Sequence, residues 1–356
     1  MKLALLSLLL LAAAPSFAQS DDCAGIVPTA GDFIEATVTP RQADWSCTGA
    51  TGDQGGVLAF ESHPRFNGYV WNTFDASGAP LGEFTTDGKE LVPQPQGFEG
   101  TVREPRAFGG ISIDKFDIDG TVLASQSVGG DMCAASIFRS SETGAIGLSA
   151  CYARTPAPAS MEVFDTDGNQ TSAAIVGDNT AQRFAVGDEN GMNLVVFYPG
   201  AQFGYGSESV VGQWFDDSGA QVSPAFLITT RAQSTQPTFL LRSLIGGGAA
   251  LQVSGQWVAS FPGGVAEVDP PPQFLADHPG WDVETVRGRL AYALVSRDGG
   301  AFGNHLPLYS AAGNRCGAVD FPDVQSLSIG ADGTVIGATG TNGCTKRWWP
   351  ALLSAP

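Results

Sequence analysis

The segment Phe74-Asp75-Ala76-Ser77-Gly78 belongs to a five-residue pattern, Phe-Asp-x-x-Gly, that recurs along the chain. The other copies are Phe116–Gly120, Phe164–Gly168 and Phe215–Gly219. The steps between successive copies are 42, 48 and 51 residues. A repeat period of this size indicates a fold built from successive copies of one supersecondary unit.

Each copy of the pattern predicts the turn of a β-hairpin. A run suited to a strand precedes it, as in Tyr69–Thr73, and another follows it, as in Thr121–Leu123. The aspartate carboxylate can accept a hydrogen bond from a backbone N–H two residues later, which forms the turn locally. The glycine supplies a positive φ without steric strain, and the phenylalanine anchors the end of the strand.

Weaker copies extend the register to the end of the chain. They begin at Phe261, at Tyr309 and at Trp349, which makes seven registers in total. Strand-like runs separated by turn residues recur about every ten residues between them, and no segment of useful length has helical periodicity. The sequence therefore predicts an all-β protein, a seven-bladed β-propeller with six blades as the alternative.

The last register is incomplete, because the chain ends at Pro356. We interpret Thr334–Ala338 and Lys346–Leu353 as its inner strands. An unpaired edge would open a circular fold, so the missing outer strands must come from elsewhere. Residues 26–50 contain two unassigned strand-like segments, Phe33–Thr39 and Asp44–Cys47. We expect these N-terminal strands to complete the C-terminal blade, within a single domain that spans residues 21–356.

Residues 1–18 have the features of a secretory signal peptide, with Lys2, an apolar core and a small-x-small site that ends at Ala18. We therefore expect a secreted or periplasmic protein and no membrane span. The net charge is −18, and it becomes one unit more negative when Lys2 is removed. A chain this acidic is repelled by nucleic acids and by anionic membranes, so neither is an expected partner.

Six cysteines in an exported chain predict three structural disulfides. They lie in three sequence-local groups, which are Cys23 with Cys47, Cys133 with Cys151, and Cys316 with Cys344. Fifteen pairings are possible. Cys133–Cys151 is the preferred pair, because both residues flank a tight turn at residues 141–144, although their strands would belong to neighbouring blades. No cysteine–histidine spacing fits zinc, and we expect no metal and no cofactor.

The whole pattern resembles the broad class of secreted bacterial β-propellers whose blades carry a Phe-Asp-x-x-Gly hairpin. The resemblance covers nearly all of the mature chain and implies the fold, but no activity. The turns are also similar to the Asp-box of sialidase propellers. They depart from it because the Ser-x-Asp lead is absent and no tryptophan follows the glycine in the right place.

Three glycine-flanked loops carry aromatic and amide side chains that suit a ligand-binding surface. The candidate ligand-binding residues are Phe66, Asn67, Tyr69, Phe203, Tyr205, Phe302, Asn304 and His305. Exposed rings beside amides can stack on sugars or dock peptides. The alternative is that these rings fold back onto the core of their blades.

No residue pattern identifies a catalytic site. We expect an exported, monomeric, non-catalytic binding or scaffolding protein whose unknown extracytoplasmic ligand is a glycan or a protein. The alternative is a hydrolase or lyase that acts on glycans. Such an enzyme needs two carboxyl groups about 5–10 Å apart, and the sequence marks no such pair.

Overall fold

The structure of the chain is a computed structural model. It describes residues 21–40, 47, 49–52, 58–62, 68–94, 96–103, 110–129, 133–139, 144–151, 158–177, 182–198, 200–230, 239–263, 268–295, 304–330, 332–340 and 342–354. The predicted signal peptide lies outside these residues. No helix in the described ranges is long and apolar enough to cross a membrane.

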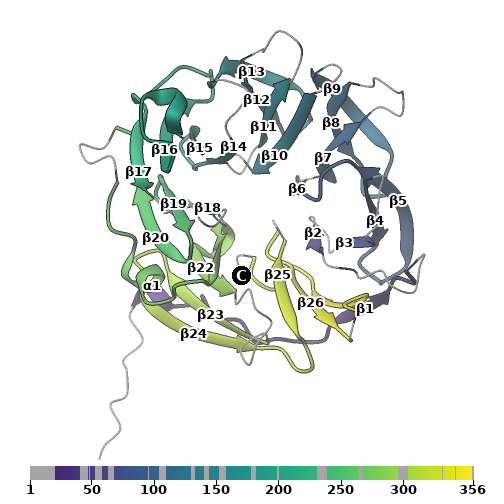
Figure 1. Cartoon of the computed structure of the whole chain (residues 1–356). Coiled ribbons are helices and arrows are strands. Elements are labelled where there is room, and N and C mark those ends of the chain that lie inside the picture. Colours follow the sequence, from purple (N-terminus) through teal and green to yellow (C-terminus); the bar gives the residue numbers. More distant parts are fainter. Residues whose placement is uncertain are drawn as a thin grey trace, which may run out of the picture.

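The described strands form seven sheets arranged in a ring (Figure 1). Six sheets have four strands and one has three, and consecutive strands within a sheet are antiparallel. The chain is a seven-bladed β-propeller, so the predicted fold is confirmed and the six-bladed alternative is excluded. In each blade the first strand lies nearest the centre of the ring, and later strands lie progressively further out.

The first four blades follow the chain in order. Blade 1 contains β2 (Thr51–Gly52), β3 (Leu58–Ser62), β4 (Tyr69–Phe74) and β5 (Pro80–Thr86). Blade 2 contains β6 (Leu91–Pro93), β7 (Phe98–Arg103), β8 (Ile111–Phe116) and β9 (Val122–Gly129). Blade 3 contains β10 (Cys133–Arg139), β11 (Gly144–Cys151), β12 (Ser160–Asp165) and β13 (Gln170–Ile175). Blade 4 contains β14 (Gln182–Gly187), β15 (Met192–Tyr198), β16 (Ser209–Asp216) and β17 (Phe226–Thr230).

The remaining blades include the few helical turns. Blade 5 contains β18 (Phe239–Ser243), β19 (Ala249–Val253) and β20 (Gln256–Ser260), followed by the short helix α1 (Gln273–Ala276). Blade 6 contains β21 (Asp282–Val286), β22 (Ala291–Val295), β23 (His305–Ser310) and β24 (Arg315–Asp320). Blade 7 contains β25 (Ser326–Ile329), β26 (Val335–Thr339), β27 (Thr345–Trp349) and β1 (Ile34–Thr37). Three 3₁₀ turns are η1 (Asp21–Cys23), η2 (Gly200–Phe203) and η3 (Arg287–Arg289).

The ring closes through strand β1, as the sequence predicts. β1 pairs antiparallel with β27, and Ile34 lies opposite Trp348. The N-terminal segment contributes one described strand to the blade, whereas two were expected. The difference arises because β25, which the sequence analysis did not identify, already supplies the innermost strand. Of the second predicted segment, residues 44–46 lie outside the described residues, and the Cys47 N–H donates to the Asn342 carbonyl at 3.1 Å.

The repeated turns have the predicted hairpin geometry and connect the third and fourth strands of blades 1 to 4. In the first, the Asp75 carboxylate accepts N–H groups from Ser77 at 2.8 Å and from Ala79 at 3.0 Å. Gly78 has a φ of 85°. The carboxylates of Asp165 and Asp216 accept the equivalent pairs of N–H groups. In blade 2, Asp117 bonds the Ile118 N–H instead, and Asp119 accepts the Thr121 N–H.

These turns also form the contacts between neighbouring blades, because each one rests on the outer part of the blade before it. A methyl group placed on Gly120 would lie 2.9 Å from the Glu83 carbonyl oxygen of blade 1. The same construction on Gly78 meets the Glu35 carbonyl of β1, and on Gly219 it meets Ala174 of blade 3. The recurring glycine is therefore needed both for its positive φ and for the close approach of two blades.

The apolar core is divided among the interfaces between blades. One cluster joins blades 1 and 2 through Trp71, Phe84, Phe98 and Phe116, and the Phe84 and Phe116 rings stack at 4.3 Å. Because the anchoring phenylalanine of the turn is buried here, one short motif supplies both a turn and a core residue.

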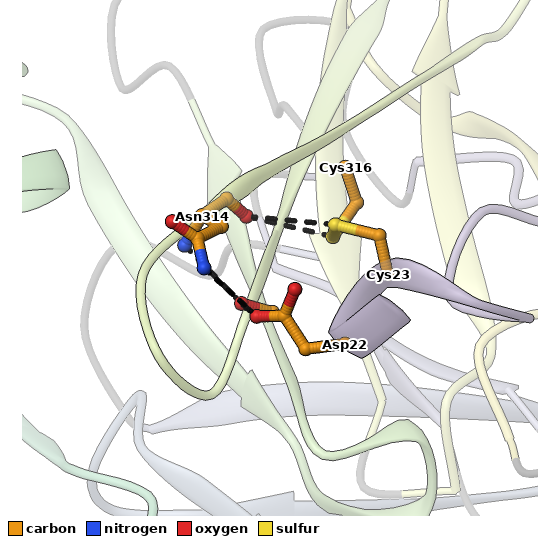
Figure 2. The surroundings of a disulfide bond; sticks show 5 residues. Asp22, Cys23, Asn314 and Cys316 are labelled. Atoms are coloured by element: carbon orange, nitrogen blue, oxygen red, sulfur yellow. Dashed lines mark hydrogen bonds between the residues drawn. A yellow bond between two sulfur atoms is a disulfide. The ribbon is translucent and has the colours of Figure 1, made fainter. Parts of the chain in front are cut away.

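Three disulfides are present, and two of them tie the ends of the chain together. Cys23 bonds to Cys316 on β24 and Cys47 bonds to Cys344, which spans 293 and 297 residues respectively. Beside the first bridge, the Asp22 carboxylate accepts the Asn314 side-chain amide at 2.9 Å (Figure 2). These four cysteines therefore do not pair with their neighbours in the sequence. Each bridge joins a cysteine near the N-terminus to one near the C-terminus, because ring closure brings the two ends of the chain together.

The third bridge, Cys133–Cys151, is the one that the sequence analysis preferred. The expectation that its two strands belong to neighbouring blades was wrong. β10 and β11 are adjacent strands of blade 3, and the two cysteines are direct partners in the register. Three disulfides in one chain are typical of proteins that reside in an oxidising, extracytoplasmic environment.

Candidate functional site: the central channel

Residues of the seven innermost strands converge on one central channel. They line a cavity of about 410 Å³. The lining includes Thr51 of β2, Val92 of β6, Ile137 of β10, Val186 of β14, Arg242 of β18, Thr285 of β21 and Ser328 of β25. Consecutive residues of these strands line the cavity, such as Leu241, Arg242 and Ser243 of β18, so the inner edge of each sheet faces the channel. The result is a concave site whose lining mixes polar and apolar groups.

Arg242 is held firmly in the channel wall between blades 5 and 6. Its Nη2 donates to the Asp282 carboxylate at 2.8 Å and lies 3.6 Å from the Glu284 carboxylate. Its Nε donates to the Val283 carbonyl at 3.1 Å. Burial alone would lower the pKa of Arg242, but these two carboxylates outweigh it and raise the pKa above its ordinary value. The guanidinium therefore stays charged and presents a fixed ion cluster to the channel.

Two exposed charges stand opposite this cluster. Lys89 and Glu90 lie on the link that enters β6 and also line the cavity. The channel lining thus contains groups of both charges beside apolar residues. Such a wall favours a polar ligand that carries both hydrogen-bond donors and acceptors over a simple ion.

A second cavity of about 350 Å³ adjoins the channel at blade 7. It shares Gly49, Ala50 and Ser328 with the channel lining and extends to Asp282 and Lys346. Lys346 is buried, and its ammonium donates to the Cys47 carbonyl at 3.1 Å. The closure of the ring and the wall of this cavity therefore depend on the same residues.

The aromatic loop residues proposed from the sequence are dispersed over blades 1, 4 and 6. Phe66, Asn67 and Phe302 lie outside the described residues. Tyr69 is the half-buried first residue of β4. Asn304 is exposed, and its backbone carbonyl accepts the Phe321 N–H at 2.8 Å.

Phe203, Tyr205 and His305 have partners within their own blades. The Phe203 ring packs on Phe197 at 4.6 Å, and the Tyr205 hydroxyl donates to the Ala225 carbonyl at 3.1 Å. His305 Nδ1 lies 2.6 Å from the Asp320 carboxylate. Among the described candidates none lines the channel cavity. Their role in ligand binding stays a prediction.

Sequence patterns did not identify the residues of the channel wall, for a physical reason. Thr334–Ala338, interpreted from the sequence as an inner strand, lies mostly in β26, the second strand of blade 7, and β25 lies inside it. Second strands such as β15 are conspicuous because they are continuous, buried apolar runs. Innermost strands such as β21 and β25 mix polar and apolar residues and do not stand out in the sequence.

Comparison with known proteins finds only distant likenesses to solved structures. No protein-family model matches the sequence, and no curated protein matches it. Solved structures that match include a eukaryotic initiation factor, at 11% identity and a TM-score of 0.38 over 90% of this chain and 89% of that one. BBS1N in complex with ARL6DN matches at 11% identity and a TM-score of 0.49, over 90% of this chain and 96% of that one. The C-terminal WD40 domain of Sif2 matches at 10% identity and a TM-score of 0.40, over 91% of this chain and 97% of that one.

Proposed function

We propose that this protein is an exported, non-catalytic binding protein whose propeller holds a polar ligand, such as a glycan or a peptide, in the central channel. The observation that carries the proposal is the convergence of all seven innermost strands on one cavity of about 410 Å³. The Arg242 cluster supplies donors and acceptors at its wall. Three disulfides and the signal-like N-terminus support secretion or a periplasmic location.

The charged groups of the channel favour binding over catalysis. Asp282 and Glu284 are the carboxylates that a hydrolase would need, but both face Arg242 and belong to one strand. A carboxyl group that acts on a substrate must come within hydrogen-bond reach of the reacting atoms. Asp282 and Glu284 are instead engaged with the Arg242 guanidinium.

The test is to fill the channel. We expect Ser328→Trp to abolish the binding of whichever soluble oligosaccharides or short peptides raise the melting temperature of the mature protein. Val222→Trp is the control, because it adds the same ring on the outer rim. Equal binding by the two variants would contradict the proposal, and so would conversion of the oligosaccharide into shorter products.

Mass spectrometry of the exported protein should find Gln19 at the N-terminus.

A further inference from the structure

The outer edge of blade 2 is a strand edge with little protection. Within the described strands, β9 has β8 as its only sheet neighbour, so one of its edges faces outward. β9 has eight residues and contains no charged residue and no proline. Proteins normally blunt such edges with charge, proline or a covering segment, because exposed N–H and C=O groups pair with other strands.

Several other outer strands of the ring have protection that β9 lacks. β5 begins with Pro80 and carries Glu83. β24 is covered by the N-terminal segment, which is bonded to it through Cys23–Cys316 and packs Val27 near Gly317. β17 is shorter, and its Phe226 and Ile228 are buried. β13 of blade 3 also lacks charge and proline, but it has six residues against eight in β9. β9 is therefore the longest of the described outer strands that carry neither charge nor proline.

Apolar side chains are exposed at the start of β9. Val122 and Leu123 are each 51% exposed. Exposed apolar residues beside an open edge offer both side-chain and main-chain contacts to an added strand.

The charges around this edge are negative. The side chain of Asp119 is exposed, and hydrogen bonds from the backbone N–H and the side chain of Thr121 lower its pKa, so it is ionised at neutral pH. On the other side of β9, the turn of blade 3 places Asp167 nearby, since Gly168 approaches Ala124 of β9. Lys115 on β8 does not offset these charges at the surface, because it is buried and its ammonium donates to the Thr166 carbonyl.

We propose that the outer edge of β9 accepts an extended, cationic and apolar segment of a partner protein as an added strand. Main-chain hydrogen bonds to the open edge supply affinity, Val122 and Leu123 receive apolar side chains, and Asp119 and Asp167 select positive charge. The charge argument disfavours a second copy of this chain as the occupant, because each copy carries a net charge of −18 or more negative. The surface is independent of the channel and of any ligand bound there.

The test uses synthetic strand peptides of the same length as β9, with alternating lysine and valine. Fluorescence anisotropy should show that the lysine peptide binds the mature protein, and that a matched glutamate–valine peptide binds at least about tenfold more weakly. Binding should weaken as salt is added. N-methylation of alternate peptide amides should abolish it, because the added strand then lacks its donors.

Leu123→Lys should weaken binding of the lysine peptide about tenfold or more, by placing a like charge on the edge. Val222→Lys is the matched control, since Leu123 and Val222 each follow the turn glycine by three residues and Val222 is 38% exposed. Hydrogen exchange should show new protection at residues 122–129. Equal effects of the two variants, tight binding of the glutamate peptide, or self-association that Leu123→Lys abolishes would each overturn the proposal.

Discussion

Glu99 is a carboxylic acid with no exposed surface, in the second strand of blade 2. Its Oε2 accepts the Gln94 side-chain amide at 3.1 Å, and among the described groups its Oε1 has no hydrogen-bond partner. Burial raises the pKa of Glu99 from 4.5 to about 7, although Gln94 and the nearby Lys115 oppose the shift. A carboxylate in this position is poorly solvated, so the neutral acid is the better fit to the fold.

This burial predicts a pH-dependent stability. Because the pKa of Glu99 is higher in the folded than in the unfolded chain, the folded state retains a proton that the unfolded state has lost. Stability should therefore fall as pH rises from about 4.5 to 7, by on the order of 3 kcal/mol from this group. Glu99→Gln should remove that loss, as measured by denaturant melts across the pH range. The exposed Glu90→Gln is the control, and an unchanged pH profile for Glu99→Gln would refute the assignment.

The candidate site could be predicted only in part from the sequence, because a residue type does not show which way its side chain points. An aromatic residue in a glycine-flanked loop can point outward or inward with little change in the local pattern. Phe203 shows the inward case, since its ring packs on Phe197. Whether a loop ring reaches a ligand depends on the neighbouring strands, which a single-sequence pattern does not specify. Arg242 was missed for the same reason, because its partners Asp282 and Glu284 lie in another blade.

At the scale of the element, the repeated turn combines two requirements on one glycine. Gly120 has a φ of 88°, and a side chain there would also meet the Glu83 carbonyl at 2.9 Å. Gly263, in the weaker turn of blade 5, has a φ of 72°, and among the described residues no heavy atom lies within 4 Å of an added methyl group. Substitution of Gly263 therefore tests backbone strain alone, whereas substitution of Gly120 tests backbone strain together with the contact between blades.

We predict that Gly263→Ala destabilises the protein by about 1 kcal/mol, which is the cost of a non-glycine residue at positive φ. Gly120→Ala should cost roughly 2–3 kcal/mol, because blade 2 must also move away from blade 1. Gly120→Val should be worse than either. Denaturant unfolding of the variants measures these differences. Equal effects at Gly120 and Gly263 would show that the approach of the two blades contributes nothing.

The strands that the sequence identified best are those with two buried faces or with the turn beside them. Third strands such as β4 and β8 end at the motif, and second strands such as β15 are continuous apolar runs. The innermost strands have weaker patterns, because their residues at the channel are a mixture of polar and apolar types. β2 is two residues long, too short for any periodicity to be visible. Element boundaries were thus clearest where burial is complete.

At the scale of the whole molecule, stability depends on joining the two ends of the chain. β1 completes blade 7, and the turn of blade 1 rests on the Glu35 carbonyl of β1. Two disulfides close nearly the entire chain into large loops. The sequence predicted the shared blade, because an incomplete last register demands a partner. It predicted Cys133–Cys151 but not the two long bridges, which follow from the position of the N-terminal segment beside blades 6 and 7.

The two long bridges should act together, and this can be measured. In the chain-entropy account of disulfides, a loop of 293 residues contributes about 5–6 kcal/mol. While one long bridge is intact, however, the other closes a loop of only about 50 residues, which contributes about 4 kcal/mol. Replacing either pair by alanines, Cys23 with Cys316 or Cys47 with Cys344, should therefore cost about 4 kcal/mol.

Replacing both pairs should cost about 10 kcal/mol, more than the two single effects combined, and should abolish the cooperative thermal transition. Alanines at Cys133 and Cys151 provide the control, because that bridge closes a loop of 18 residues within one blade and should add independently to either variant. The measurement is denaturant unfolding of the four proteins under oxidising conditions. Strict additivity of the two long bridges would mean that they do not share one loop in the unfolded chain, contrary to the way the ring is closed.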